Sequence, residues 1–171
     1  MDLSAQLELI EAAARGWIRT ERDAHRPRAS PLRPAARSLY APFFPATTLD
    51  RAAFTQVPSI ANPPFLAQAL ASGLPPIAFE EMAGITFDDT VLLSETRTAE
   101  NPMALLFHEL VHVAQYEVLG VDEFARQYVQ GYAANGFDYN RIPLEVAAYT
   151  LEQRFLTDPR AGFSVADALG Y

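Results

Sequence analysis

FHELVHVAQ, residues 107–115, is the stretch around which the rest of this chain is organised. In a helix, His108 and His112 are four residues apart and therefore lie on one face, one turn above the other. Two imidazoles placed in this way can bind a single zinc ion. Glu109 points about 100° round the helix from His108, so it can take a proton from a water molecule without being a ligand. The stretch therefore predicts a metal-assisted hydrolase site.

Residues 102–119 are predicted to form the helix that carries this motif. Asn101 is a suitable N-cap, Pro102 suits the first helical position and Gly120 suits the end. The apolar residues have the spacing of a helix that is buried on most sides: Leu105, Leu106, Leu110, Val113 and Ala114. The alternative is a pair of core histidines that bond locally. That alternative would leave the Glu109 carboxylate in an apolar helix without an evident partner.

A catalytic zinc site needs a third protein ligand, and the sequence favours a carboxylate for this place. His25 is the one remaining histidine, which argues against a third imidazole. Glu145 lies near the start of a second predicted helix, 143–156, between apolar residues, and a buried carboxylate there needs a cation. The alternative is a first-turn glutamate that is favoured by the helix dipole and open to water. Asp138 and Glu117 are the next candidates for the ligand.

The stretch 84–155 resembles the core of the gluzincin metallopeptidases, particularly their small bacterial members. Such proteins show a short strand, an HELVHVxQ helix and a later glutamate on a helix, often followed by alanine and an aromatic residue. The matching pieces here are Gly84–Phe87, His108–Gln115, and Glu145 with Ala148 and Tyr149. The helix motif is the specific part of the resemblance.

The resemblance implies a zinc-dependent hydrolase that cleaves a peptide bond in a peptide or protein substrate. It implies one zinc ion held by His108, His112 and Glu145, with Glu109 as the general base. It also implies a minimal zincin-like α+β fold, in which an extended substrate pairs with an edge strand near residues 84–93.

The chain departs from this family in having no histidine after His112. Gluzincins that stabilise the oxyanion with a downstream histidine therefore offer no template. Tyr139 or Tyr149 would have to stabilise the oxyanion instead. This departure keeps open an alternative function, namely a catalytically silent, zinc-stabilised binding or scaffold module with a zincin fold.

Length and composition predict one globular domain, 1–171, with a metallopeptidase core at 74–157. Half of the 171 residues are hydrophobic and a fifth are charged, and cysteine is absent, so no disulfide or cysteine ligand is expected. The start of the chain lacks the basic head and apolar run of a signal peptide, and no stretch has the roughly 20 apolar residues of a membrane span. We therefore expect a cytoplasmic protein. The oligomeric state is not predicted.

The net charge of −8 is distributed unevenly along the chain. Residues 1–79 hold eight arginines against six acidic residues, whereas 80–171 hold five arginines against fifteen. The acidic half contains the proposed metal site, and it would repel phosphates. A nucleic-acid substrate is therefore not expected.

A first helix is predicted over residues 3–24. Its apolar stripe consists of Leu3, Leu7, Ile10, Ala14 and Trp17, and beside it lie Arg15, Arg19, Arg22 and Arg26. The narrow apolar stripe favours packing on the protein core, with a solvated arginine face partly paired through Glu11 and Arg15. The alternative, a basic helix that touches an anionic membrane, is the less favoured.

The remaining predictions concern shorter segments. The proline-rich stretch 27–64 is predicted to be an ordered arm, mostly without regular helix, that holds a short strand near 52–57. A short helix at 65–72 should end at Gly73. After Gly120, Asp122 is predicted to cap a helix over 123–129 that ends near Gly131, followed by a pocket-rimming loop over 131–140. A last helical turn is expected at 165–169.

Overall fold

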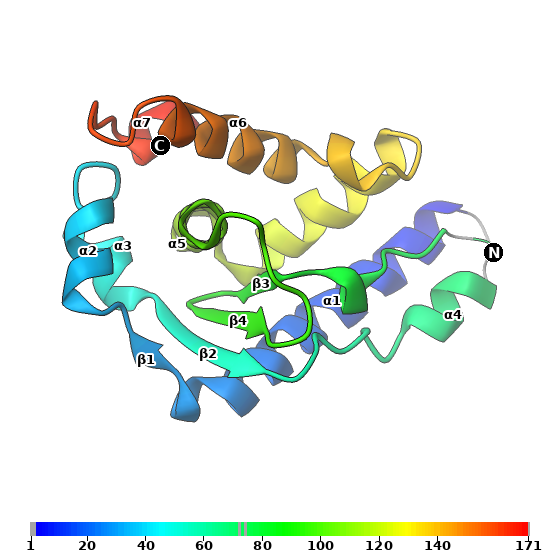
Figure 1. The fold of residues 1–171 in the computed structure, drawn as a ribbon. Helices are drawn as coiled ribbons and strands as arrows, with labels where there is room; N and C mark the ends of the chain where they lie inside the picture. Colours follow the sequence, from blue (N-terminus) through cyan, green and yellow to red (C-terminus); the bar gives the residue numbers. More distant parts are fainter. Residues whose placement is uncertain (1–2, 72, 74, 171) are drawn as a thin grey trace.

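The fold is built around a small mixed β-sheet, which helices surround (Figure 1). The computed structural model describes residues 3–71, 73 and 75–170. Within these residues the sheet has the order β1-β2-β4-β3. The strands are β1 (Ser30–Pro31), β2 (Ala53–Val57), β3 (Gly84–Phe87) and β4 (Thr90–Ser94). β2 and β4 are parallel, and the other two pairs are antiparallel. The predicted α+β class is confirmed; for the sheet, which was expected to be small and either antiparallel or mixed, the structure shows the mixed form.

The predicted edge strand forms as the outer strand of a hairpin. β3 pairs with β4 from Gly84 opposite Leu93 to Phe87 opposite Thr90. Asp88 has a positive φ of 58°, a conformation that Asp tolerates better than most residues. The tight turn leaves β3 at the edge of the sheet.

The long helix α5 (Pro102–Ala134) passes over the sheet and consists of two parts joined at a kink (Figure 1). It begins as predicted, because the Asn101 side chain accepts hydrogen bonds from the backbone N–H groups of Met103 and Ala104. Gly120 has a non-helical conformation, with φ 69° and ψ 170°, which only glycine adopts without strain. The first part therefore ends where the sequence predicted.

The second part of α5 is longer than predicted. Residues 121 and 122 are already helical, so Asp122 does not cap this part; its carboxylate accepts a hydrogen bond from Arg19 instead. The helix also continues past Gly131, which is buried and helical. A Cβ at Gly131 would lie 2.6 Å from Cδ of Pro143. This glycine therefore permits close helix packing rather than ending the helix, and the predicted loop over 131–140 begins only after Ala134.

Helix α6 (Pro143–Thr157) packs along α5 and carries the second half of the predicted site. The rings of Phe107 and Phe155 stack at 4.5 Å with an interplanar angle of 11°. They belong to one core cluster, which also includes residues of the short helix α7 (Val165–Leu169). A second cluster joins the sheet to α1 and to the far part of α5. The two clusters hold α5 in place between the sheet and α6.

The proline-rich arm contains more helix than predicted. A 3-10 turn, η1, spans Arg26–Arg28, and the helices α2 (Pro34–Tyr40) and α3 (Ala46–Arg51) follow it. The predicted strand forms as β2. The predicted helix at 65–72 forms as α4 (Leu66–Ala71), and Gly73 follows with a φ of 79°. Ser72 lies outside the described residues. Further 3-10 turns, η2 and η3, span Phe79–Glu81 and Tyr139–Arg141.

Helix α1 (Leu3–His25) uses its two stripes differently from the prediction. Trp17 and Ile18 are buried, but Leu3 is 49% exposed. The other members of the apolar stripe, Leu7, Ile10 and Ala14, line a cavity. Buried Glu11 accepts a hydrogen bond from Gln130, 3.0 Å away, instead of pairing with Arg15. Arg15 and its neighbours in the arginine stripe pair with Asp122 and Asp89.

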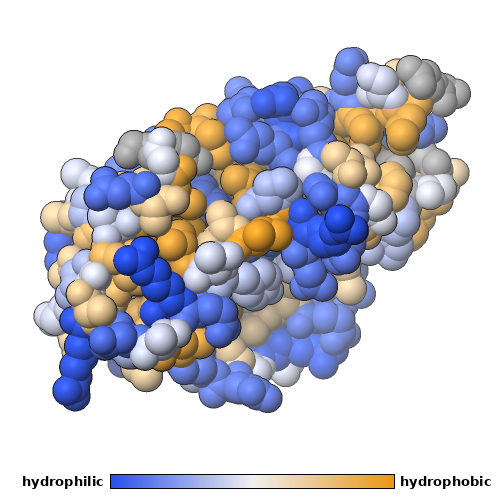
Figure 2. All heavy atoms as spheres, turned by 90° about the horizontal axis from the view of Figure 1, so that it is seen from above, coloured by the Kyte–Doolittle hydropathy of each residue, from blue (hydrophilic) through white to orange (hydrophobic). Residues whose placement is uncertain are grey.

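The surface seen from above mixes hydrophilic and hydrophobic residues (Figure 2). Hydrophobic side chains gather at the end of the molecule where α1 begins and α4 lies, and Leu3 and Leu70 are about half exposed there. Among the described residues, no helix has the length and apolar character needed to cross a membrane.

Candidate metal centre

Three predicted ligands come together between α5 and α6. His108 Nε2 lies 3.1 Å from His112 Nε2 and 3.2 Å from Glu145 Oε2. The third side of this triangle, from His112 Nε2 to Glu145 Oε2, is 3.5 Å. All three side chains are buried. They form a group that could hold a metal ion.

The other nitrogen of each imidazole faces a hydrogen-bond acceptor. His108 Nδ1 lies 3.0 Å from Glu152 Oε2, and His112 Nδ1 lies 2.8 Å from Gln115 Oε1. The orientation of the Gln115 amide is fixed because its Nε2 donates to the backbone carbonyl of Leu144 at 3.0 Å. Each Nδ1 must therefore carry a proton, which leaves a lone pair on each Nε2 of the neutral rings.

The donor set fits a metal ion. When both rings are neutral and protonated at Nδ1, the two Nε2 atoms and Glu145 Oε2 are three lone-pair acceptors that face one another. Their separations of 3.1, 3.2 and 3.5 Å match the ligand–ligand distance of about 3.3–3.4 Å that bonds of roughly 2.0–2.1 Å give in a tetrahedral zinc site. A cation between them would satisfy all three acceptors.

The pKa values of the ligands also indicate that the site favours positive charge. Burial lowers the pKa of the His108 imidazole, but hydrogen bonds to Glu145 and Glu152 outweigh it and raise the pKa to about 10. Without a metal, His108 therefore carries a second proton, which faces Glu145, and a bound cation would take the place of that proton. Burial also acts to raise the pKa of Glu145, yet the imidazoles of His112 and His108 hold it well below its usual range. Glu145 is therefore ionised and stabilises a cation beside it.

Glu109 lies beside the ligands and is held in place by β3. Thr86 Oγ1 donates a hydrogen bond of 2.6 Å to Glu109 Oε2. The other carboxylate oxygen lies against Gly84, where a Cβ would be only 2.8 Å from Glu109 Oε1. Burial raises the pKa of Glu109 above its ordinary value. The carboxylate is therefore fixed in orientation and more basic than a solvated glutamate.

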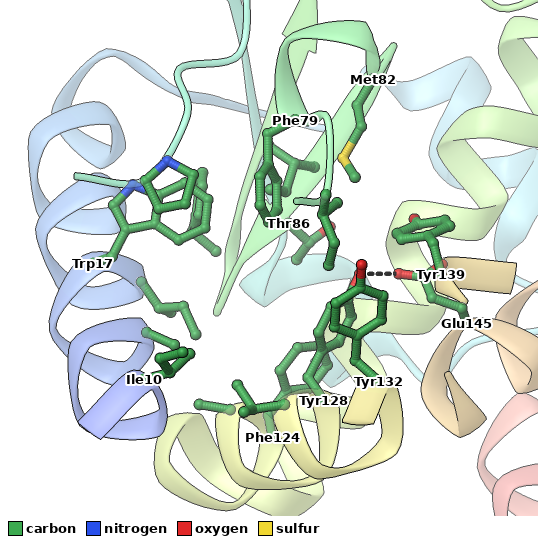
Figure 3. A pocket seen from close by; sticks show the side chains of 18 of the residues that line it. Ile10, Trp17, Phe79, Met82, Thr86, Phe124, Tyr128, Tyr132, Tyr139 and Glu145 are labelled. Carbon is green, nitrogen blue, oxygen red and sulfur yellow. Dashed lines mark hydrogen bonds between the residues drawn. The ribbon is translucent and has the colours of Figure 1, made fainter. Parts of the chain in front are cut away.

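The tyrosines near the metal-binding group differ in their contacts and in their exposure. Tyr128, on the far part of α5, donates a hydrogen bond of 2.8 Å to Glu145 Oε1, so that Oε2 faces the imidazoles (Figure 3). Tyr139 lines the cavity near Glu145, and burial and the Glu145 charge raise its pKa. Tyr149 is 40% exposed, and its ring lies 4.4 Å from the ring of His108.

The second-choice ligands lie elsewhere. Asp138 is exposed and accepts a hydrogen bond from the backbone N–H of Asn140. Glu117 is exposed and accepts a hydrogen bond of 2.6 Å from Thr48. His25 lies at the end of α1, 3.4 Å from Glu21. None of these three belongs to the metal-binding group.

Four supporting residues were not predicted to have these roles: Gln115, Glu152, Thr86 and Tyr128. Two of them carry a signal in the spacing. Gln115 is three residues after His112, and Glu152 is seven after Glu145, so each shares a helix face with a ligand. Thr86 and Tyr128 carry no such signal, because their contacts depend on how β3 and the kinked half of α5 pack.

An apolar cavity of about 150 Å³ opens beside the metal-binding group. Glu109, both histidines and Glu145 lie at one end of it. Ile10 and Trp17 of α1 lie across from Tyr139 and Glu145 (Figure 3). The cavity therefore joins the polar group to a wall that is predominantly hydrophobic.

Comparison of the chain with protein-family models, with curated proteins and with solved structures found no match.

Proposed function

We propose that this protein is a zinc-dependent hydrolase that cleaves a peptide bond, with a site of the gluzincin type. The observation that carries the proposal is the buried triangle of His108, His112 and Glu145, in which each Nδ1 faces an acceptor and each Nε2 faces the other two ligands. The resemblance of the HELVHVAQ motif to gluzincin metallopeptidases supports it.

The residues of this chain have distinct roles in the proposed reaction. His108, His112 and Glu145 would hold the zinc ion. When bound, zinc would activate a water molecule for attack and polarise the scissile carbonyl. Glu109 takes the proton from the attacking water and delivers it to the leaving amine. Thr86 supports this role, because its hydroxyl fixes the orientation of the Glu109 carboxylate.

Of the two predicted tyrosines, Tyr139 is the better placed to stabilise the oxyanion. Tyr139 lines the cavity, whereas Tyr149 is 40% exposed and lies against the ring of His108. The Tyr139 hydroxyl, like that of any tyrosine, is protonated at neutral pH, and burial raises its pKa further, so it can donate a hydrogen bond to developing negative charge. We assign the oxyanion role to Tyr139 and expect Tyr139→Phe to lower kcat more than Tyr149→Phe.

The proposal is tested by a peptide library incubated with the protein, with and without a chelator. We expect cleavage that the chelator abolishes. Glu109→Gln should lower kcat by at least ~100-fold, the usual contribution of a general base, and should still bind about one zinc per chain because Glu109 is not a ligand. Glu145→Ala should lose most of its zinc affinity. Loss of the metal in Glu109→Gln, or full affinity in Glu145→Ala, would contradict these roles.

The same experiment addresses the scaffold alternative. A zinc-stabilised module without turnover would show no cleavage, and its melting temperature would fall when the chelator is added. Chelator-sensitive cleavage that Glu109→Gln removes would decide for the enzyme.

A further inference from the structure

We propose that the cavity beside the metal centre is a specificity pocket, and that it receives an uncharged, apolar side chain of about phenyl size next to the bond that is cleaved. The position of the pocket next to a cleaved bond rests on the function proposed above. The pocket itself rests on its lining, its volume and the uncharged side chains that line it away from the metal end. The pocket and the hydrolase function can therefore be tested separately.

The first observation is the wall that α1 provides. Leu7, Ile10 and Ala14 recur at three- and four-residue spacing and line the cavity, whereas a stripe packed on the core would be covered. Of these, Ile10 is seen across the cavity from Glu145 (Figure 3). Trp17 closes this wall, with its ring 5.1 Å from that of Phe79 and 4.9 Å from that of Phe87. An apolar group bound here would contact side chains on several sides.

The second observation is the distribution of charge. Among the described residues, the only Asp, Glu, Lys, Arg or His side chains that line the cavity are Glu109, Glu145 and the two histidines, all at the metal end. Glu109 is held by Thr86, and Glu145 by Tyr128 and the imidazoles. No arginine is among the described residues that line the cavity, so a carboxylate has no cationic side chain to pair with away from the metal end. A charged side chain or chain terminus would lose its hydration without compensation.

The third observation is the volume. The cavity is about 150 Å³, and an apolar cavity of about 150 Å³ in another protein binds benzene. A phenylalanine or leucine side chain therefore fits. Ala14 sets part of this limit, because a larger side chain at this position on α1 would occupy the cavity. The pocket thus selects by charge and by size.

Tryptophan fluorescence tests the pocket directly, because Trp17 is the single tryptophan of the chain and lines the cavity. The full-length protein is titrated with N-acetyl-phenylalaninamide and N-acetyl-argininamide, with and without zinc. We expect a saturable change in emission with the phenylalanine amide and at least tenfold weaker binding of the arginine amide. Equal responses to the two amides, or no saturable response to the aromatic one, would overturn the proposal.

Two variants and a control examine the size limit. Ala14→Phe should weaken binding of the phenylalanine amide at least tenfold, whereas Ala12→Phe, on the exposed side of the same helix, should not. Ile10→Ala should enlarge the pocket and improve binding of N-acetyl-naphthylalaninamide relative to the phenyl ligand. Unchanged ligand preference in both cavity variants would show that α1 does not form the pocket wall.

Library cleavage separates this inference from the proposed function. Selective binding of the apolar amide without chelator-sensitive cleavage would refute the hydrolase and leave the pocket. Cleavage without preference for a phenyl- or leucine-sized side chain beside the bond would refute the pocket and leave the hydrolase.

Discussion

At the scale of single residues, the metal-binding group depends on the side chains that hold the far nitrogen of each imidazole. His108 and His112 lie on one helix, so sequence spacing alone places their rings on one face. The acceptors Glu152 and Gln115 hold Nδ1 of each ring, so that both rings present Nε2 to the metal-binding group. Such partners raise the basicity of the ligands and fix their orientation.

Glu152→Gln should therefore weaken metal binding by ~10–100-fold, the usual cost of losing such a partner. The amide is similar in size, but it replaces a carboxylate that only accepts with a group that can present a donor to His108 Nδ1. Competition with a chromophoric chelator measures the affinity. Glu123→Gln is the matched control, because Glu123 pairs with Arg126 on an exposed surface of α5. Equal affinities in the two variants would argue against this role for Glu152.

Thr86 permits a second prediction at this scale. Its hydroxyl donates to Glu109 Oε2, and hydrogen bonds to charged groups contribute about 1.5–3 kcal/mol. Thr86→Val keeps the shape of the side chain and removes the donor, so we expect kcat to fall by ~10-fold or more with the zinc content unchanged. Thr86→Ser should restore most of the activity. A valine variant with wild-type kcat would show that Glu109 is oriented without this contact.

At the scale of elements, the ends of the helices were predicted well where a cap or a proline marks them, and less well elsewhere. Asn101 with Pro102 marked the start of α5, and Gly120 marked its kink. The proline-rich arm was predicted to be mostly without regular helix, and the two helices in it were not predicted, because proline breaks helix interiors but is tolerated at their starts. α2 begins with Pro34, and α3 follows Pro45 as N-cap.

Gly131 shows why a glycine in a sequence cannot be assigned without its neighbours. A terminating glycine has a positive φ, as Gly136 does at 73°. Gly131 instead is helical, and it leaves room for Pro143 at the start of α6, which occupies the space where a Cβ would be. That contact joins residues that are separated by a loop, so the local pattern contained no sign of it.

Replacement of this glycine tests the contact between α5 and α6. Gly131→Ala places a Cβ 2.6 Å from Cδ of Pro143, and overpacking of this kind typically costs about 1–3 kcal/mol. Gly16→Ala in α1 is the matched control, because nothing lies within 4 Å of its Cβ position and alanine favours helix by about 0.5–1 kcal/mol. Denaturant unfolding should show Gly131→Ala less stable than Gly16→Ala by ~1–3 kcal/mol. Equal stabilities would mean that α6 shifts at no cost.

At the scale of the whole molecule, the core of the site could be predicted from sequence, but the cavity could not. His108, Glu109 and His112 are encoded by local spacing, and Glu145 by a carboxylate in apolar surroundings. The α1 stripe of Leu7, Ile10 and Ala14 has the same pattern whether a helix packs on a core or borders a cavity. Only the positions of α4 and β3 around it leave the space open.

The last prediction concerns the contacts that attach α1 to the sheet. Arg22 donates two hydrogen bonds of 2.9 Å to the Asp89 carboxylate, and Arg26 donates to the Asp89 carbonyl. Burial acts to raise the pKa of Asp89, but the hydrogen bonds from Arg22 and Thr90 and the charge of Arg26 lower it overall below 3.8. Because the folded-state pKa is depressed, this stabilisation is present above the unfolded pKa and is lost as the pH falls through the folded value.

Asp89→Asn should therefore lower the free energy of unfolding at pH 7 by about 1–3 kcal/mol, and the difference from wild type should shrink as the pH falls below ~4. Denaturant unfolding at a series of pH values measures this. Asp23→Asn is the control: Asp23 also pairs with Arg22, but its side chain is 71% exposed, and exposed pairs contribute little. A difference in the free energy of unfolding that stays constant across the pH range would mean that the variant acts through packing. In that case the charge of Asp89 would not be what holds α1, which forms the wall of the cavity, against the β3–β4 hairpin.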